Sequence, residues 1–345
     1  MDFAKRVSNI QKTFLESKKN GLLVFGVENV YYLTSFRGSF SVLIVLKSKA
    51  YLFVDGRYYE KAKNCSSLCE VILFENLAGE IEKIVKAEKV AELFFDAEDV
   101  TVAFISELTE KLKDIKLTPS AKKIVKDLRS IKDEAEIKVM KEGAKKSKKI
   151  IKKFLDENLK AGVTERLLAS QLEFIIKNQA EGISFDTIVA SGKNSSLPHA
   201  VPTKRKIGKN DIVLIDYGLR WKGYCTDHTR TTILGVNRLE KYYNIVEEAI
   251  RVGLSCVKPG NAISLLDEKI RAFFQRKGVL NNFLHSSGHG IGLSVHEKPT
   301  LSYKTKGVFK EGMVFTIEPG LYFEGIGGIR LEEMFYVTKK GYEIL

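Results

Sequence analysis

Five residues in the C-terminal part of the 345-residue chain carry side chains that bind divalent cations, and four of the five are carboxylates. They are Asp216, Asp227, His289, Glu318 and Glu332. Carboxylates gathered in one pocket repel each other, and bound divalent cations remove that repulsion. The residues therefore predict a site for two metal ions of the kind that promote hydrolysis.

The first carboxylate pair lies in two apolar, β-branched segments separated by a short turn. The segments span residues 211–218 and 224–234, and their pattern predicts a β-hairpin. A turn centred between Trp221 and Lys222 places Asp216 directly opposite Asp227 on one face. Like charges at opposed positions destabilise a strand pair, so this register predicts a cation between the two aspartates.

The second pair repeats this construction further along the chain. Residues 313–318 and 328–338 are expected to form another hairpin, and Glu318 and Glu332 are both seven residues from Gly325. A turn centred at Gly325 places the two glutamates opposite each other. Glu333 points to the other face, because side chains alternate along a strand, and is the weaker ligand candidate.

His289 lies between glycines in the segment 286–292, and these glycines let the backbone approach something bulky. Imidazole suits Mn, Co, Fe or Zn, whereas carboxylates favour harder ions such as Mn or Mg. The combined set favours Mn²⁺ or Co²⁺, with Zn²⁺ or Fe²⁺ as alternatives. Arg330 precedes Glu332 by two residues, so we expect it on the same face, orienting that carboxylate. His228 alternates to the face opposite Asp227 and is expected to pack.

With these motifs, the chain resembles the proline-specific exopeptidases of the creatinase/methionine-aminopeptidase superfamily, the aminopeptidase P and prolidase branch. The motifs that carry the resemblance occur in order at residues 185–192, 194–199, 216–218, 226–231, 288–292, 295–297, 317–320 and 328–332. The resemblance implies an α/β (α+β) protein with a creatinase-type N-terminal α/β domain, residues 1–120, and a pita-bread catalytic domain, residues 121–345. It also implies proline-containing peptides as substrates and a homodimer.

In the mechanism that the resemblance implies, two metal ions hold a water or hydroxide that attacks a peptide carbonyl. Asp216 binds one metal ion and His289 the other, while Asp227, Glu318 and Glu332 bridge or chelate. Glu318 is also the general base.

Three further histidines match family positions. His199 and His296 would lie on the substrate side of the metals and donate to the scissile carbonyl and the developing oxyanion. His285 would lie near the pocket without binding a metal ion. Phe185 and Tyr322 are candidate apolar walls of the substrate pocket, with packing in the core as an equal alternative.

The family leaves three functions open. The favoured one is an Xaa-Pro aminopeptidase; a prolidase, which cleaves Xaa-Pro dipeptides, is the alternative. A dipeptidase needs a cation that receives the prolyl carboxylate, and this chain has Thr300 where relatives often have arginine. Lys298 or Arg330 could replace that arginine. A non-enzymatic relative that binds peptides or nucleic acid would be expected to have lost several of the five ligands.

The net charge of +13 raises the question of nucleic-acid binding. Much of the excess lies within residues 121–160, where an apolar stripe alternates with lysines at helical spacing. This pattern is typical of a solvated helix face, so no nucleic-acid partner is expected.

The remaining patterns concern location and the N-terminal region. No apolar stretch of 18 residues occurs, so no membrane span is expected. The four cysteines are too scattered for a disulfide framework, and the N-terminus lacks a signal-type core, so we expect a cytoplasmic protein. Strands are predicted at residues 21–25, 41–46 and 50–54, and a linker is predicted to begin at residues 118–120.

Overall fold

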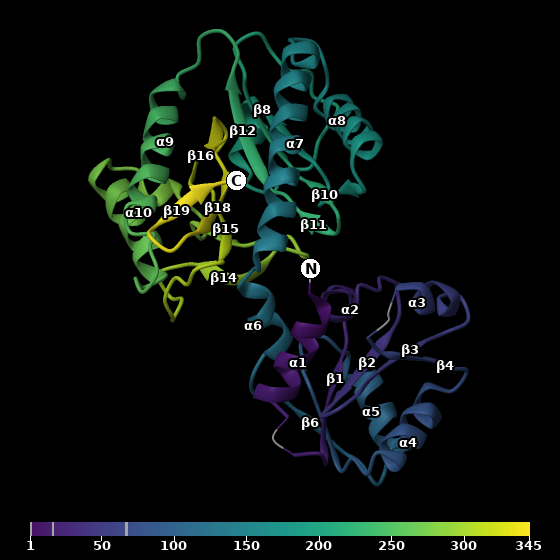
Figure 1. Cartoon of the computed structure of the whole chain (residues 1–345). Coiled ribbons are helices and arrows are strands. Elements are labelled where there is room, and N and C mark those ends of the chain that lie inside the picture. Colours follow the sequence, from purple (N-terminus) through teal and green to yellow (C-terminus); the bar gives the residue numbers. More distant parts are fainter. Residues whose placement is uncertain (1, 16, 66–67) are drawn as a thin grey trace. The chain divides into compact units, whose positions relative to one another are not determined.

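The computed structural model describes residues 2–15, 17–65 and 68–345. The chain divides into two compact units, Met1–Arg129 and Ser130–Leu345, coloured purple to blue and teal to yellow in Figure 1. Within the described residues, no helix combines the length and apolar character that crossing a bilayer requires.

The first unit is built on one mixed sheet of six strands in the order β4-β3-β2-β1-β5-β6. The strands are β1 (Asn20–Val24), β2 (Val42–Leu46), β3 (Ala50–Val54), β4 (Glu70–Leu73), β5 (Glu92–Phe95) and β6 (Lys116–Pro119). The helices are α1 (Phe3–Thr13), α2 (Val27–Thr34), α3 (Tyr59–Cys65), α4 (Leu77–Ala87), α5 (Val102–Lys111) and α6 (Ile124–Ser130). The three predicted strands are confirmed as β1, β2 and β3. Thr118 and Pro119, predicted to begin a linker, instead belong to β6, an edge strand where proline is tolerated.

The first half of the second unit pairs two helices with small sheets. The elements are α7 (Glu134–Asn158), α8 (Glu165–Gln179), β7 (Gly182–Ile183), β8 (Ile188–Ser191), the 3₁₀ helix η1 (Gly192–Ser196), β9 (Ile212–Tyr217), β10 (Leu219–Trp221), β11 (Tyr224–Cys225) and β12 (His228–Ile233). The sheets have the orders β11-β10-β7 and β12-β9-β8. Apolar side chains of α7 and α8 pack against β8 and β9 to form one core.

The second half repeats this arrangement. Its elements are α9 (Glu240–Leu254), α10 (Ser264–Arg276), the 3₁₀ helix η2 (Leu280–Asn282), β13 (Gly288–Gly290), β14 (Glu297–Leu301), β15 (Val314–Ile317), β16 (Gly320–Phe323), β17 (Gly327–Arg330), β18 (Glu333–Val337) and β19 (Tyr342–Ile344). The sheets have the orders β14-β13-β15-β18-β19 and β16-β17. Helices α7 and α8 lie on one side of the strands, and α9 and α10 on the other (Figure 1). This is the two-sided architecture that the pita-bread prediction implies.

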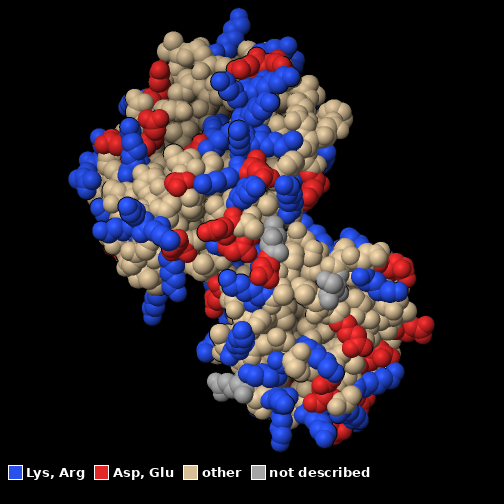
Figure 2. All heavy atoms as spheres, viewed as in Figure 1, with Lys and Arg blue, Asp and Glu red and all other residues tan. Residues whose placement is uncertain are grey.

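Helix α7 confirms the amphipathic helix predicted from the lysine-rich segment. Asp133 caps its first turn, and Glu136 closes a reciprocal capping box. Met140 and Phe154 are buried on one face, and Figure 2 shows Lys and Arg side chains gathered over the opposite, exposed face. The charge therefore covers the solvent side of a core helix.

The predicted register of the first hairpin is wrong by two residues. Trp221 pairs with Tyr224, and Asp216 pairs with Thr229 instead of Asp227. The turn is centred between Lys222 and Gly223, which have φ values of 47° and 84°. A two-residue turn of this kind needs positive φ at both central positions, and glycine adopts it more readily than tryptophan would. Because the shift is an even number of residues, Asp227 stays on the face of Asp216.

The register of the second hairpin is confirmed. Gly320 pairs with Arg330 and Phe323 with Gly327, and Ile317 pairs with Glu333. Gly325, with a φ of 68°, lies at the centre of this pairing. Glu318 and Glu332 therefore occupy opposed positions between the paired segments, as their equal distance from Gly325 predicts.

Candidate metal centre and active site

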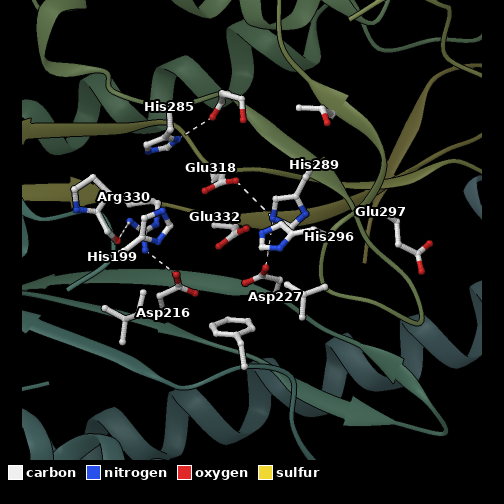
Figure 3. Close-up of a pocket in the computed structure, with 16 residues that line it drawn as sticks. His199, Asp216, Asp227, His285, His289, His296, Glu297, Glu318, Arg330 and Glu332 are labelled. Atoms are coloured by element: carbon white, nitrogen blue, oxygen red, sulfur yellow. Dashed lines mark hydrogen bonds and ion pairs between the residues drawn. The ribbon is translucent and has the colours of Figure 1, made fainter. Parts of the chain in front are cut away.

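A cavity of about 570 Å³ lies between the two halves of the second unit. Its lining includes every residue that the sequence indicated as ligand, catalytic or neighbouring group: His199, Asp216, Asp227, His285, His289, His296, Glu318, Arg330 and Glu332. Figure 3 shows the four carboxylates and His289 arranged around one space, with His199 and His296 at its sides. The fold thus brings residues more than 100 positions apart in the sequence into one pocket.

The four carboxylates lie at or next to the ends of the hairpin strands. Asp216 lies near the end of β9, and Asp227 directly precedes β12. Glu318 directly follows β15, and Glu332 lies between β17 and β18. The two hairpins are joined by a hydrogen bond from the Glu332 backbone N–H to the Thr229 carbonyl, with an N–O distance of 3.2 Å. The two carboxylate pairs are therefore connected through the backbone of their hairpins.

Three carboxylate oxygens in the cavity accept no hydrogen bond from any described residue although they are buried. They are Asp216 Oδ1, Asp227 Oδ1 and Glu332 Oε1. A buried carboxylate oxygen without a donor is costly. Divalent cations would satisfy these oxygens, so the donor set fits metal ions.

His289 presents a ring nitrogen to the carboxylates. Its Nε2 lies 3.5 Å from Asp227 Oδ2 and 3.6 Å from Glu318 Oε1, as the dashed lines in Figure 3 mark. One ligand atom each of Asp227, His289 and Glu332 lies within 4.8 Å of the other two. These separations fit atoms that share a small ion, while Glu318 and Asp216 extend the donor set.

The glycines around His289 make room for the backbones of neighbouring strands. A Cβ on Gly288 would collide with the Thr316 carbonyl of β15, and one on Gly290 would collide with the Lys298 carbonyl of β14. The close approach expected from the sequence is confirmed, and the approaching groups are the backbones of neighbouring strands. The close packing of β13 between β14 and β15 fixes the position of His289.

The charges of the site explain the pKa shifts of its acids. Burial raises the pKa of Asp227 well above its usual range, and repulsion from Glu332, Asp216 and Glu318 raises it further. Burial, followed by repulsion from Glu318 and Asp216, likewise raises the pKa of Glu332. Burial raises the pKa of Glu318 to about 8, although Arg330 opposes this shift. Positive charge is therefore what these carboxylates lack.

The histidine at the centre is held neutral. Burial, followed by the neighbouring His296, lowers the pKa of His289 to about 4. Neutral imidazole is the form that binds a metal ion. The His289 Nδ1 lies 3.1 Å from the Gly290 carbonyl, and a proton on Nδ1 leaves Nε2 free to face the carboxylates.

Arg330 is buried at the other side of the carboxylates, and its guanidinium is almost fully engaged. It donates to Asp216 Oδ2 at 2.7 Å, the Tyr322 hydroxyl at 2.8 Å, the Pro198 carbonyl at 3.1 Å and Thr229 Oγ1 at 3.1 Å. The sequence placed Arg330 beside Glu332, but its carboxylate partner is Asp216. Thr229 Oγ1 donates to Glu332 Oε2 at 2.8 Å, so Arg330 acts on Glu332 through this hydroxyl.

Two of these groups were not predicted in these roles. Tyr322 is no wall of the cavity: it lies behind His285, with 2.9 Å between its hydroxyl and His285 Nε2, and is 3% exposed. Thr229 was not singled out, although its position two residues after Asp227 signals the same strand face. Phe185 does line the cavity.

The residues set aside in the sequence lie outside the cavity lining. Glu333 forms ion pairs with Arg230 and with Lys148, the latter at 2.9 Å. His228 is fully buried, with Nδ1 3.6 Å from Glu333 Oε2. These groups form a second charged cluster beneath the hairpin strands, on the face opposite the carboxylates.

His199 and His296 occupy the rim. Both are exposed in the described structure, and the rings of His289 and His296 lie 4.3 Å apart, edge to face. His199 follows Pro198, whose carbonyl accepts from Arg330. Both side chains can therefore contact a molecule bound in the cavity.

Comparisons with known proteins identify the family of the chain. Residues 138–339 match the model of metallopeptidase family M24, and residues 6–131 match the creatinase/prolidase N-terminal domain. The Xaa-Pro dipeptidase of Pyrococcus furiosus is 34% identical over 342 residues, which cover 98% of this chain and 96% of that protein.

Solved structures of two relatives share the whole fold. The Xaa-Pro dipeptidase from Bacillus anthracis has a TM-score of 0.92 at 34% identity, covering 100% of this chain and 96% of that one. The X-Pro aminopeptidase from Thermotoga maritima has a TM-score of 0.88 at 32% identity, covering 97% and 96%. The chain therefore belongs to metallopeptidase family M24 and carries a creatinase/prolidase N-terminal domain followed by a pita-bread catalytic domain.

Proposed function

We propose that this metallopeptidase is an Xaa-Pro aminopeptidase, which removes the residue before proline from peptides that continue beyond the proline. The choice of an aminopeptidase over a dipeptidase rests on the hydrogen bonds that Arg330 forms within the protein. Arg330 is the only arginine or lysine among the described residues that line the cavity, and four of its hydrogen bonds go to groups of the protein. A dipeptide carboxylate has no free guanidinium to bind.

The other candidate cation, Lys298, does not supply the missing charge. Thr300 lines the cavity as a neutral side chain, and Lys298 is absent from the described lining. A site that recognises a free carboxylate normally presents a charged partner to it. A longer peptide, whose proline carbonyl is part of an amide, needs no such partner.

The proposed chemistry uses two divalent ions, Mn²⁺ or Co²⁺ first, with Zn²⁺ or Fe²⁺ as alternatives. Asp216, Asp227, His289, Glu318 and Glu332 would hold the two ions. When bound, these ions lower the pKa of a water molecule and polarise the scissile carbonyl.

The protein's own residues complete the reaction. Glu318 accepts the proton of the attacking water, since its carboxylate borders the same space as His289. His199 and His296 donate hydrogen bonds to the carbonyl oxygen as negative charge develops there. His285 and Arg330 orient their neighbours: His285 Nε2 and Arg330 Nη1 both contact the Tyr322 hydroxyl.

An Xaa-Pro dipeptidase is the second candidate. Its support comes from relatives named Xaa-Pro dipeptidase that align along nearly the whole chain at 34% identity. The two activities share the metals, the base and the histidines, and differ only in how the far side of the proline is bound. Substrate length separates them.

The deciding experiment compares Ala-Pro with Ala-Pro-Ala-Ala, using metal-stripped enzyme before and after Mn²⁺ addition. Release of alanine from the tetrapeptide supports the proposal, whereas cleavage of the dipeptide alone assigns a dipeptidase. Ala-Ala-Ala-Ala is the control for proline specificity. Bound metal is counted in parallel, and metal binding without cleavage of either proline peptide contradicts the proposed specificity.

The proposal extends to assembly and location. We propose a homodimer in the cytoplasm that acts on proline-containing peptides, without a nucleic-acid or membrane partner. The four cysteines are free thiols, which suits a reducing compartment. Sedimentation equilibrium measures the assembly, and a monomer at micromolar concentration would contradict it.

A further inference from the structure

The loop that carries His199 is tied at both ends to one buried carboxylate. Glu165, the first residue of α8, is 0% exposed. Its Oε1 accepts from Ser191 N at 2.8 Å and from Ser191 Oγ at 2.7 Å. Its Oε2 accepts from Thr203 N at 3.0 Å and from Thr203 Oγ1 at 2.6 Å. Ser191 and Thr203 bracket His199 in the sequence.

Asn194 adds a third anchor inside the loop. Its side-chain amide donates to both oxygens of Glu165, each at 3.1 Å. Both lone-pair regions of the carboxylate are therefore directed at the loop, and the described structure gives Glu165 no side-chain cation within ion-pair distance. Its hydrogen bonds come from hydroxyl, amide and backbone N–H donors of a single segment, and the nearby Arg205 also attracts its charge.

Two further hydrogen bonds connect the loop to strand β17, which carries Arg330 of the cavity. Ser195 Oγ accepts from Gly328 N at 2.8 Å, and the Pro198 carbonyl accepts from Arg330 at 3.1 Å. His199 follows Pro198 directly and is exposed at the rim. Fixing the two loop ends reduces the number of conformations that His199 can adopt.

We propose that Glu165 is a positioning residue for His199: it closes the loop from Ser191 to Thr203 and so holds the imidazole toward the scissile carbonyl. This inference rests on the role given to His199 under the proposed function. Glu165 itself does not line the cavity, so it acts on catalysis through the loop.

The charge state supports this role. Burial opposes ionisation of Glu165, but the hydrogen bonds from Thr203 and Ser191 outweigh it, so the pKa of Glu165 lies below its usual range. The carboxylate is charged at neutral pH and can accept at both oxygens. A glutamine has one acceptor oxygen, and its NH₂ would face the backbone N–H of either Ser191 or Thr203.

The test is a double-mutant cycle with Glu165→Gln and His199→Ala, measured as kcat on the peptide that the wild-type enzyme cleaves. We expect Glu165→Gln to lower kcat about 10- to 100-fold, in the range that misplacing a catalytic group costs. KM and bound metal should stay near the wild-type values. In the His199→Ala background, Glu165→Gln should change kcat less than about twofold, because residues that act as a unit are not additive.

Two further variants serve as a control and as a substitute. Glu157→Gln removes a carboxylate from the exposed end of α7, where the side chain is 57% exposed, and should leave kcat unchanged. If Glu165→Gln does not fold, Thr203→Val removes the hydroxyl that donates to Glu165 and accepts from Arg205 N. This variant should show a smaller loss with the same dependence on His199.

The outcomes separate this inference from the function on which it rests. Equal losses from Glu165→Gln with and without His199 would overturn the positioning role while leaving His199 catalytic. Wild-type kcat in His199→Ala would remove the catalytic role of His199 and this inference with it. Failure of the wild-type enzyme to cleave any Xaa-Pro peptide would instead contradict the proposed function.

Discussion

Arg330 Nη2 lies 2.7 Å from Asp216 Oδ2, and both side chains are buried. The two residues come from different hairpins, β9 and β17, so this ion pair links the halves of the catalytic unit at the candidate metal centre. Asp216 keeps one oxygen for Arg330, while its Oδ1 has no partner among the described residues. The division explains how one carboxylate can be both oriented and available to a metal ion.

The first prediction concerns this pair. Arg330→Met leaves the buried Asp216 carboxylate without its cation, a change that typically costs about 3–5 kcal/mol of stability. Metal affinity should fall about 10- to 100-fold, as when other orienting partners of ligands are lost. Isothermal titration of metal-stripped protein with Mn²⁺ measures the affinity, and urea denaturation measures the stability. Wild-type affinity in a folded variant would contradict the orienting role.

The second prediction separates ligands from their neighbours. Asp227→Asn should reduce bound metal below two ions per chain, because it removes a buried charge whose Oδ1 has no other partner. Glu333→Gln is the matched control: Glu333 follows the ligand candidate Glu332 but pairs with Lys148 and Arg230. Elemental analysis after dialysis should find full metal content in the control. Metal loss in Glu333→Gln but not in Asp227→Asn would contradict the assignment of Asp227 as a ligand and of Glu333 as a non-ligand.

How far the sequence predicts this site depends on the level considered. Strand faces were predictable, because alternation needs only the spacing of Asp216, Asp227, Glu318 and Glu332. The register of the second hairpin was also predictable, since Gly325 marks its centre. The register of the first hairpin could have been predicted from the turn residues: positive φ at both central positions favours Lys222-Gly223 over Trp221-Lys222, because glycine adopts it without steric cost.

Contacts between segments distant in sequence were beyond reach. Nothing in the spacing indicates that Arg330 pairs with Asp216 across 114 positions, or that Tyr322 lies behind His285 instead of facing the cavity. Glu165 was likewise not singled out, because its role appears only when residues 191–203 fold over the start of α8. Such pairings follow from packing, which local patterns do not encode.

The third prediction concerns the proton acceptor. Glu318→Gln keeps the volume of the side chain but removes the basic group, so kcat should fall at least about 10²-fold at saturating metal. The assay needs metal content measured in the same sample, since Glu318 is also a ligand candidate. Near wild-type turnover with two bound ions would remove Glu318 as the base.

The fourth prediction introduces the missing carboxylate clamp. Thr300 lines the cavity and is exposed, so Thr300→Arg places a guanidinium where a free prolyl carboxylate could reach it. The ratio of kcat/KM for Ala-Pro to that for Ala-Pro-Ala-Ala should rise about tenfold, the equivalent of about 1.4 kcal/mol. Thr300→Gln controls for length without charge. An equal rise in Thr300→Gln would show that charge is not what distinguishes the substrates.

The fifth prediction concerns acid stability. Asp211 accepts from Arg205 at 2.6 and 3.1 Å and from Gly208 N at 2.6 Å. Although burial opposes it, these bonds hold the pKa of Asp211 below its usual range. Because the pKa is lower in the folded than in the unfolded state, the stabilisation is complete above the unfolded value of about 3.9 and is lost as the pH falls through the folded value.

We therefore expect Asp211→Asn to lower the free energy of unfolding by about 1–3 kcal/mol at pH 7, with a smaller difference from wild type below about pH 4. Urea denaturation at a series of pH values measures the free energy of unfolding of both proteins. The protein is stripped of metal first, because metal ions dissociate at low pH and would add their own pH dependence. Asp156→Asn, an exposed aspartate on α7, should show no such pH dependence. If the difference in unfolding free energy between wild type and Asp211→Asn stays constant down to pH 3, Asp211 stabilises the fold by packing instead of by its charge.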